Sequence, residues 1–404
     1  MMKKIAIIFT LMVMIFPIIN VKPANAAEEI SEASAAMVFD QKTGQILYSE
    51  NPDKQVAIGS ITKILTLYLV TKAINEGKIK YTDKLTPTKQ QADMTQKDEL
   101  SNVSLKTDQS YTVKDLYDAA WIVSSNSAAM MLAQKVSGNQ ADFVKEMRKT
   151  LNDWGIKDAE INNVSGLNNS ALKKGMYLGN KDGENKMTTN DLAIMTKHVL
   201  SEYPEITKTT SKQKFAFSNG KDTHTYTSLN LLLKGNRDYQ EGYEFDGLKT
   251  GTTTQAGDSF VGTLPFKGRR LVTIVMDAKG NSDNLDKRYR STQTLMRYVN
   301  ENYVYKDVLN KDQEVKVSAS QSYKLNQNVG LWIKNDVNTA ALEYGVSKTA
   351  LGFRTNTDKK ILPTNLEYGF LPEKNVAKKV TTKKTSTPHK SWWESFLDFF
   401  KNLF

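Results

Sequence analysis

A serine and a lysine, Ser60 and Lys63, stand three positions apart just ahead of an apolar run. If a helix begins near Ser60, the two side chains lie on the same face, because residues three apart are neighbours on a helix surface. A serine hydroxyl becomes a nucleophile when a base takes its proton, and a lysine amine can be that base when burial or a nearby cation lowers its pKa. A solvated surface pair has the same spacing, so the rest of the chain must decide.

Two further short motifs could complete such a site. Ser124-Ser125-Asn126 separates two strongly apolar helical runs, where these residues could equally be ordinary helix caps. Lys249-Thr250-Gly251 precedes two segments with the pattern of strands. The fragments Ser-x-x-Lys, Ser-x-Asn and Lys-Thr-Gly together are typical of class A β-lactamases and penicillin-binding proteins. Each fragment is weak alone, but their order, spacing and structural context agree.

The sequence resembles the low-molecular-mass penicillin-binding proteins that act as D-alanyl-D-alanine carboxypeptidases, from about Ala33 to the C-terminal segment. The resemblance implies an α+β fold, in which an antiparallel sheet is flanked by helices and carries an inserted all-helical subdomain. A small β-rich domain and a C-terminal amphipathic helix would follow. Supporting stretches are 40–44, 166–167, 225–232 with Asn230, 246–251 and 256–257.

The resemblance assigns the reacting groups. Ser60 would attack the carbonyl of the penultimate D-Ala of a peptidoglycan stem peptide, and Lys63 would take its proton. Ser124 would pass a proton towards the leaving D-Ala. The backbone N–H groups of Ser60 and Thr252 would form the oxyanion hole, whose donors are each worth about 10²–10³ in rate. β-Lactam antibiotics would acylate Ser60 by the same route.

The resemblance also assigns the groups that bind substrate. Asn126 would hold a substrate amide, while Lys249, Thr250 and Thr252, with Gly251 in the same strand, would attract the terminal carboxylate. The charge of Lys249 would also help to keep the amine of the catalytic lysine neutral.

Arg288 sits where this family often has an arginine, although a helix-surface arginine explains it equally well. The sequence departs from many relatives at Ile58-Gly59 before the nucleophile and at Ser125 within the second motif. Neither departure removes a reacting group. The segment 162–186, rich in Asn, Gly and Lys, is predicted to be a long irregular loop over or beside the site.

The local patterns predict the elements that position these motifs. A hairpin is expected over 35–49, and a helix from Ser60 to a stop at Gly77. Further helices are expected over 116–123, 128–136, 139–151, 189–203 and 287–303, strands over 259–264 and 271–277, and short strands over 314–317, 329–333 and 350–353.

The N-terminal residues have the pattern of a secretory signal peptide. Lys3 and Lys4 precede an apolar run, and a small-x-small cleavage site lies at 24–26. An uncleaved anchor helix is the alternative, but the run is short for a span of about 20 residues and contains Pro17. Cleavage would lower the formal charge from +11 to +8. The predicted divisions are a signal peptide (1–26), a catalytic domain (27–305), a β-rich domain (306–375), a linker (376–390) and a terminal helix (391–404).

That terminal segment, SWWESFLDFFKNLF, places its aromatic and leucine side chains on one helical face and polar side chains on the other. It is too short and too polar to span a bilayer, so the pattern favours a helix lying at a membrane surface. Lysines of the preceding linker would add attraction to anionic lipid. A helix docked on the protein's own core is the alternative. The expected location is the outer face of the cytoplasmic membrane.

Two other classes of function stay open. A class A-like β-lactamase would need a carboxylate to activate the deacylating water, and no acid between the second and third motifs stands in a Glu-x-x-Leu-Asn setting. A membrane-tethered wall-binding protein would keep the motifs without turnover.

Composition excludes several kinds of site. The 404 residues include no cysteine, which rules out a disulfide framework and thiol chemistry. The three histidines, His198, His224 and His389, are isolated, so no metal site and no cofactor is predicted. Lysines are scattered among acids, which does not indicate nucleic-acid binding.

Overall fold

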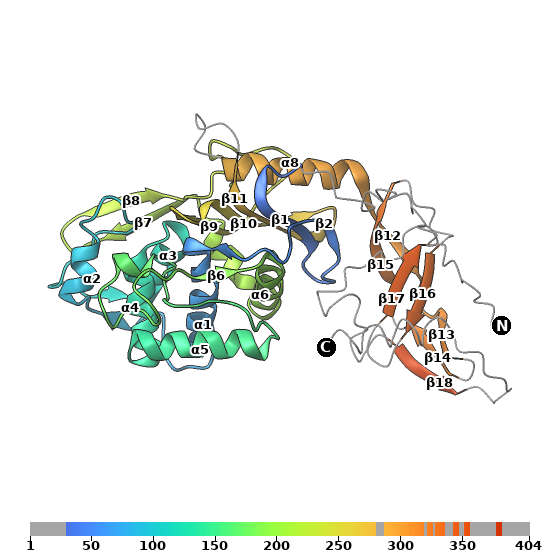
Figure 1. The fold of residues 1–404 in the computed structure, drawn as a ribbon, viewed down its shortest axis with the longest axis horizontal. Coiled ribbons are helices and arrows are strands. Elements are labelled where there is room, and N and C mark those ends of the chain that lie inside the picture. The colour runs from blue at the N-terminus through green and yellow to red at the C-terminus, as the bar shows by residue number, and fades with distance from the viewer. Residues whose placement is uncertain are drawn as a thin grey trace, which may run out of the picture.

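The computed structural model describes residues 30–279, 287–318, 321–325, 328–335, 342–346, 351–355 and 377–381 (Figure 1). The predicted signal peptide and the predicted terminal helix lie outside the described residues. Within the described residues, no helix combines the length and the hydropathy that crossing a membrane requires.

A five-stranded antiparallel sheet forms the centre of the larger part of the molecule. Its strands are β1 (Ala33–Asp40), β2 (Ile46–Glu50), β9 (Gly247–Thr253), β10 (Gly257–Phe266) and β11 (Arg269–Ala278). Their order is β2-β1-β11-β10-β9, so the first strand of the described chain pairs with a strand more than 200 residues later. The hairpin predicted over 35–49 is confirmed, and the strands predicted over 259–264 and 271–277 are confirmed as β10 and β11, which pair with each other. β9 forms one edge of the sheet.

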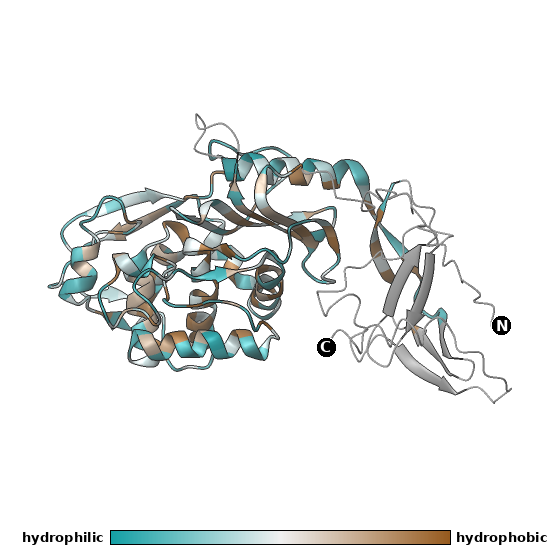
Figure 2. Cartoon of the chain, in the orientation of Figure 1, coloured by the Kyte–Doolittle hydropathy of each residue, from teal (hydrophilic) through white to brown (hydrophobic). Residues whose placement is uncertain are grey.

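Both faces of this sheet are buried. Met37 and Phe39 of β1 join a core shared with the helical region, whereas Ala36 and Val38 join a second core beneath α8 (Lys287–Asn302). Successive side chains of a strand point to opposite faces, so one strand serves both cores. In Figure 2 the hydrophobic colour accordingly concentrates where sheet and helices face each other. The predicted α+β class is confirmed.

The helical subdomain lies between β2 and β9 in the chain. Its longer helices are α1 (Lys63–Asn75), α2 (Lys89–Met94), α3 (Val113–Ile122), α4 (Asn126–Ser137), α5 (Gln140–Asp153) and α6 (Thr189–Glu202). Five of them start at side chains that accept a hydrogen bond from the first turn, namely Thr88, Thr112, Ser125, Asn139 and Thr188. The helices predicted from the apolar spacing are therefore confirmed, with ends fixed by these caps.

Short elements connect the larger ones. They are β3 (Val56–Ala57), η1 (Gly59–Thr62), β4 (Lys84–Leu85), β5 (Tyr111–Thr112), η2 (Asn169–Ala171), β6 (Lys186–Met187), η3 (Pro204–Ile206) and α7 (Thr207–Thr210). The predicted irregular loop over 162–186 thus contains one 3-10 turn, and its last residue, Lys186, begins β6.

A second, β-rich part follows α8 (Figure 1). Its strands are β12 (Tyr303–Leu309), β13 (Glu314–Ser318), β14 (Gln321–Leu325), β15 (Val329–Lys334), β16 (Leu342–Val346), β17 (Leu351–Thr355) and β18 (Ala377–Thr381). The predicted β character is confirmed. Trp332 joins the two parts: its Nε1–H donates to Asp40 Oδ2 at 2.9 Å, and its backbone exchanges hydrogen bonds with the Gln45 amide.

The structure contains strands that the sequence patterns did not predict. The hairpin β7 (Lys214–Ser218) and β8 (Thr223–Thr227) has mostly exposed side chains, so its composition resembles a loop. β18 falls at the start of the segment predicted as a linker and pairs with β14 instead. Its sequence, AKKVT, does not alternate apolar with polar residues, so the sequence pattern does not predict a strand there.

Candidate active site

Ser60 and Lys63 meet as the sequence predicts. Ser60 lies in the 3-10 turn η1, and the α-helix itself begins at Lys63 rather than near Ser60. Side chains three residues apart eclipse one another in a 3-10 turn, which brings the lysine amine over the serine hydroxyl. The distance between Lys63 Nζ and Ser60 Oγ is 2.8 Å.

The Lys63 amine is fully enclosed. The residue is 0% exposed, and its Nζ lies 2.8 Å from both Asn126 Oδ1 and the backbone oxygen of Ser165. Burial lowers the pKa of Lys63 well below its usual value, and the positive charge of Lys249 lowers it further. A lowered pKa makes the neutral form, the form that can accept a proton from Ser60, easier to reach than in an exposed lysine.

Ser124, two residues before Asn126, carries a second hydroxyl. It lies between the end of α3 and the start of α4 with a positive φ of 60°, which places a non-glycine residue in the left-handed region. The residue is 2% exposed, and its Oγ has no hydrogen-bond partner within the described residues. Buried hydroxyls are usually paired, so the unpaired oxygen of Ser124 is an exception.

Both the oxygen and the nitrogen of the Asn126 side-chain amide form hydrogen bonds. Its Oδ1 faces the lysine amine, and its Nδ2 donates to the backbone oxygen of Ser101 at 3.0 Å. The backbone N–H of Asn126 donates to the same oxygen. In this structure Asn126 therefore positions Lys63, and its contact with a substrate amide stays a prediction.

The third motif lies on the edge strand β9. Lys249 is 3% exposed, and burial, followed by the charge of Arg288, lowers its pKa to about 7. Its Nζ donates to the backbone oxygen of Thr250 at 3.1 Å. The influence of Lys249 on the catalytic amine is as predicted, although burial is the larger cause.

Arg288 is a buried residue rather than a residue of the helix surface. Its Nη1 donates to the backbone oxygens of Gly251 at 2.9 Å and Ser259 at 3.0 Å. Its Nη2 donates to Thr252 Oγ1 at 2.9 Å and pairs with Asp258. One guanidinium from α8 thus ties the end of β9 to β10 and fixes the backbone around Thr252.

The start of η1 passes directly beside the end of β9. A Cβ built on Gly59 would lie only 3.1 Å from the backbone nitrogen of Thr252, so glycine permits this close approach. The N–H groups of Ser60 and Thr252, predicted to form the oxyanion hole, therefore belong to adjacent backbones. Their joint contact with an oxyanion stays a prediction.

The sequence patterns missed the support from the 162–186 segment. Asn163 Oδ1 accepts from the backbone N–H groups of Ser165 and Gly166, which fixes the carbonyl that faces Lys63. Asn185 Nδ2 donates to Thr62 Oγ1 at 2.9 Å and to the backbone oxygen of Asn163 at 2.8 Å. The asparagine content of this segment was the available signal, because buried asparagines pair with backbone groups.

Glu184 is an acid that the β-lactamase alternative would consider. It is 2% exposed, and its Oε2 accepts from Thr253 Oγ1 at 3.0 Å. Burial raises its pKa, although the Thr253 hydrogen bond and the charge of Lys186 oppose that shift. In this structure Glu184 fixes the end of β9.

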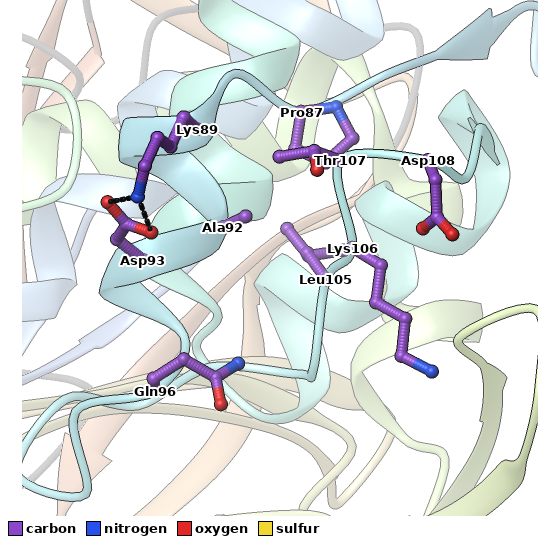
Figure 3. Close-up of a pocket in the computed structure, with 9 residues that line it drawn as sticks. All are labelled: Pro87, Lys89, Ala92, Asp93, Gln96, Leu105, Lys106, Thr107 and Asp108. Carbon is purple, nitrogen blue, oxygen red and sulfur yellow. Dashed lines mark hydrogen bonds and ion pairs between the residues drawn. The ribbon is translucent and has the colours of Figure 1, made fainter.

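A separate hollow of about 660 Å³ lies between α2 and residues 105–108 (Figure 3). Lys89 and Asp93 form an ion pair on the α2 side, while Lys106 and Asp108 project from the other side. None of the predicted site residues lines it. Within the described residues, no group of three or more His, Asp or Glu side chains could hold a metal ion.

Comparison with protein families decides the assignment. Residues 21–280 match the family model described as Peptidase_S11, D-alanyl-D-alanine carboxypeptidase. The chain belongs to this D-alanyl-D-alanine carboxypeptidase family. The family resemblance read from the motifs is thereby confirmed.

Individual members of the D-alanyl-D-alanine carboxypeptidase family agree. DacF of Bacillus subtilis is 29% identical over 63% of this chain and 59% of its own length. PBP3 of Streptococcus pneumoniae, whose structure is titled a peptidoglycan synthesis regulatory factor, is 31% identical with a TM-score of 0.72, over 88% of this chain and 99% of that chain. Cefotaxime-bound penicillin-binding protein D2 of Listeria monocytogenes is also 31% identical, with a TM-score of 0.55, over 68% and 99%.

Coverage of the curated family members is partial. The match spans 59% of DacF and 56% of DacA of Haemophilus influenzae. The comparisons show the family and the fold of this chain.

Proposed function

We propose that the protein is a serine-type D-alanyl-D-alanine carboxypeptidase that removes the terminal D-Ala from peptidoglycan stem pentapeptides and so regulates wall cross-linking. The observation that carries the proposal is the enclosed Lys63 amine, 2.8 Å from Ser60 Oγ and with a strongly lowered pKa. A buried neutral amine beside a serine is the arrangement that activates the hydroxyl.

The first half of the reaction is acylation. Ser60 Oγ bonds to the carbonyl carbon of the penultimate D-Ala while its proton passes to Lys63 Nζ. The negative charge that develops on the carbonyl oxygen is stabilised by the N–H groups of Ser60 and Thr252. Ser124 donates a proton to the amine of the leaving D-Ala as the peptide bond breaks, and its unpaired hydroxyl is suited to that contact.

The binding groups orient the substrate for this attack. The charge of Lys249 and the hydroxyls of Thr250 and Thr252 attract the terminal carboxylate. β9 is an edge strand with β10 on one side, so its other side can pair with an extended peptide. Water then hydrolyses the ester on Ser60 and releases the shortened stem peptide.

β-Lactams are proposed as covalent inhibitors that acylate Ser60 in the same way. The Listeria relative in its cefotaxime-bound form supports this part of the proposal. A long-lived adduct agrees with a carboxypeptidase, and rapid hydrolysis of the drug agrees with a β-lactamase.

The deciding experiment incubates the purified protein with a stem pentapeptide and weighs the products by mass spectrometry. Loss of one D-Ala, together with a penicillin adduct mapped to Ser60, is the expected result. Absence of both product and adduct would favour the wall-binding alternative and overturn the proposal.

The two lysines give the acylation rate a bell-shaped pH dependence. Lys63 must be neutral, so the rate falls about tenfold per pH unit below its lowered pKa. Lys249 must be charged, and because its pKa is about 7, the rate also falls as pH rises above about 7. Acylation by labelled penicillin between pH 4 and 10 measures both limbs.

A Lys249→Arg variant is the control, since an arginine stays charged and should shift the alkaline limb upwards. A wild-type rate that keeps rising to pH 10 would contradict both assignments.

We also propose that the protein acts outside the cytoplasm, at the outer face of the membrane, with residues 391–404 as a surface anchor. The amphipathic pattern of that segment supports this location. Deletion of residues 382–404, which retains β18, should release the protein from membrane pellets without loss of penicillin binding. If the shortened protein still sediments with membranes, the anchor lies elsewhere.

A further inference from the structure

Leu229 is an apolar side chain in an exposed position between buried neighbours. It is 41% exposed, while Ser228 and Asn230 on either side are 5% and 7% exposed. Within the part of the chain whose burial is described, Tyr81 at 37% is the other exposed large hydrophobic residue. A single exposed leucine is ordinary on a protein surface, so the location of Leu229 decides its meaning.

The backbone of Leu229 is fixed beside the second motif. Its N–H donates to the backbone oxygen of Ile122 at 3.2 Å, and Ile122 ends α3 two residues before Ser124. Its carbonyl oxygen accepts a hydrogen bond from the Tyr289 hydroxyl of α8. The side chain therefore projects from a backbone that is held on both sides.

The next residue connects this position to the third motif. Asn230 Nδ2 donates to the backbone oxygen of Gly247 at 3.3 Å, and Gly247 begins β9 two residues before Lys249. Asn230 Oδ1 accepts from the backbone N–H of Leu232, which holds the amide in place. Leu229 thus lies between the approach to Ser124 and the start of the strand that carries Lys249.

We propose that Leu229 contacts the side chain of the C-terminal residue that leaves, and that it determines a preference for D-Ala at that position. The inference rests on the proposed function. The amine of the leaving residue is directed to Ser124 and its carboxylate to Lys249 and Thr250. The remaining substituent of that residue is a methyl group, and Leu229 is the exposed apolar side chain between those two anchors.

The test compares two peptides that differ by that methyl group. Stem peptides ending in D-Ala-D-Ala and in D-Ala-Gly are given to the wild type and to Leu229→Ala, and kcat/KM is measured from the released amino acid. The wild type should prefer D-Ala, and Leu229→Ala should reduce that preference about three- to tenfold, because one buried methyl group contributes a factor of this size. Leu229→Met should retain the preference.

Controls separate specificity from stability. Tyr81→Ala removes the other exposed apolar side chain and should leave the D-Ala to Gly ratio unchanged. Leu229→Asn provides a second variant in case the alanine protein does not fold. If Leu229→Ala leaves the ratio of kcat/KM for the two peptides unchanged, or lowers kcat/KM equally for both, Leu229 does not determine the preference for D-Ala. Either result would leave the proposed function in place. Failure of the wild type to release either amino acid would overturn the proposed function as well.

Discussion

Replacing Lys63 with alanine is expected to slow acylation of Ser60 by labelled penicillin about 10²–10⁴-fold, the range for loss of a positioned general base. The amine lies 2.8 Å from Ser60 Oγ with 0% exposure, so bulk water cannot easily take its place as base. The measurement is the second-order rate constant for adduct formation, followed by fluorescence of the labelled protein.

Two control variants define the lowest and the highest acylation rate expected. Ser60→Ala should give no adduct and defines the background. Lys72→Ala lies on the same helix with a 43% exposed side chain and should acylate at the wild-type rate. Because Lys63→Ala leaves the oxygens of Asn126 and Ser165 without their partner, thermal unfolding should show a loss of about 1–3 kcal/mol. Wild-type acylation by Lys63→Ala would contradict the assigned role.

A second large effect is expected from Gly166→Ala. Gly166 has φ +81°, and a Cβ there would lie 1.8 Å from the backbone oxygen of Gly59, next to the nucleophile. Left-handed backbone and overpacking each destabilise by about 1–3 kcal/mol, so a total loss of at least about 2 kcal/mol is expected in chemical denaturation. Displacement of the η1 turn should also reduce acylation about 10²-fold.

Gly175→Ala is the matched control for this variant. Gly175 belongs to the same 162–186 segment and has φ +94°, but a Cβ there would meet nothing within 4 Å. Gly175→Ala has the strain of a left-handed backbone but no overlap between the new Cβ and another atom. Its free energy of unfolding should therefore fall by about 1–2 kcal/mol, and Ser60 should be acylated at the normal rate. Equal acylation by both variants would show that the contact with Gly59 does not position Ser60.

The sequence predicted the candidate side chains of the site better than the backbone groups and buried residues that hold them in place. Short motifs selected Ser60, Lys63, Ser124, Asn126 and Lys249 as candidates, and the structure brings Ser60 and Asn126 into contact with the Lys63 amine. The contact between Lys63 and the backbone oxygen of Ser165 could not be predicted, because every residue has a backbone carbonyl and the residue type does not show which one will be used. The burial of Arg288 was equally hidden, because a helix pattern does not show which strand end lies against it.

The fold, like the site, was predicted only in part. Helices with strong apolar spacing were predicted, but three of them begin elsewhere than expected. α1 begins at Lys63 rather than near Ser60, and α3 and α4 begin at Val113 and Asn126 rather than at 116 and 128. The β7–β8 hairpin was missed because β7 alternates exposed and buried side chains over only five residues, and β8 has no buried side chain to give an alternation. Leu229, which comes just after that hairpin, was missed for a related reason. Its position is set by Ile122 and Gly247, which lie far away in the chain, so no local sequence pattern points to it.

The three oxygens around Lys63 determine where the hydrogens lie. A neutral amine has two hydrogens and one lone pair. The Ser165 carbonyl and Asn126 Oδ1 can only accept, and Asn126 Nδ2 is committed to Ser101, so both hydrogens point at those two oxygens. In the neutral form the lone pair is left for Ser60, whose hydroxyl would donate to it, whereas the ammonium form donates to Ser60 Oγ. After proton transfer the ammonium has three hydrogens and the same three acceptors, so the proton can move without any rotation of the surrounding groups.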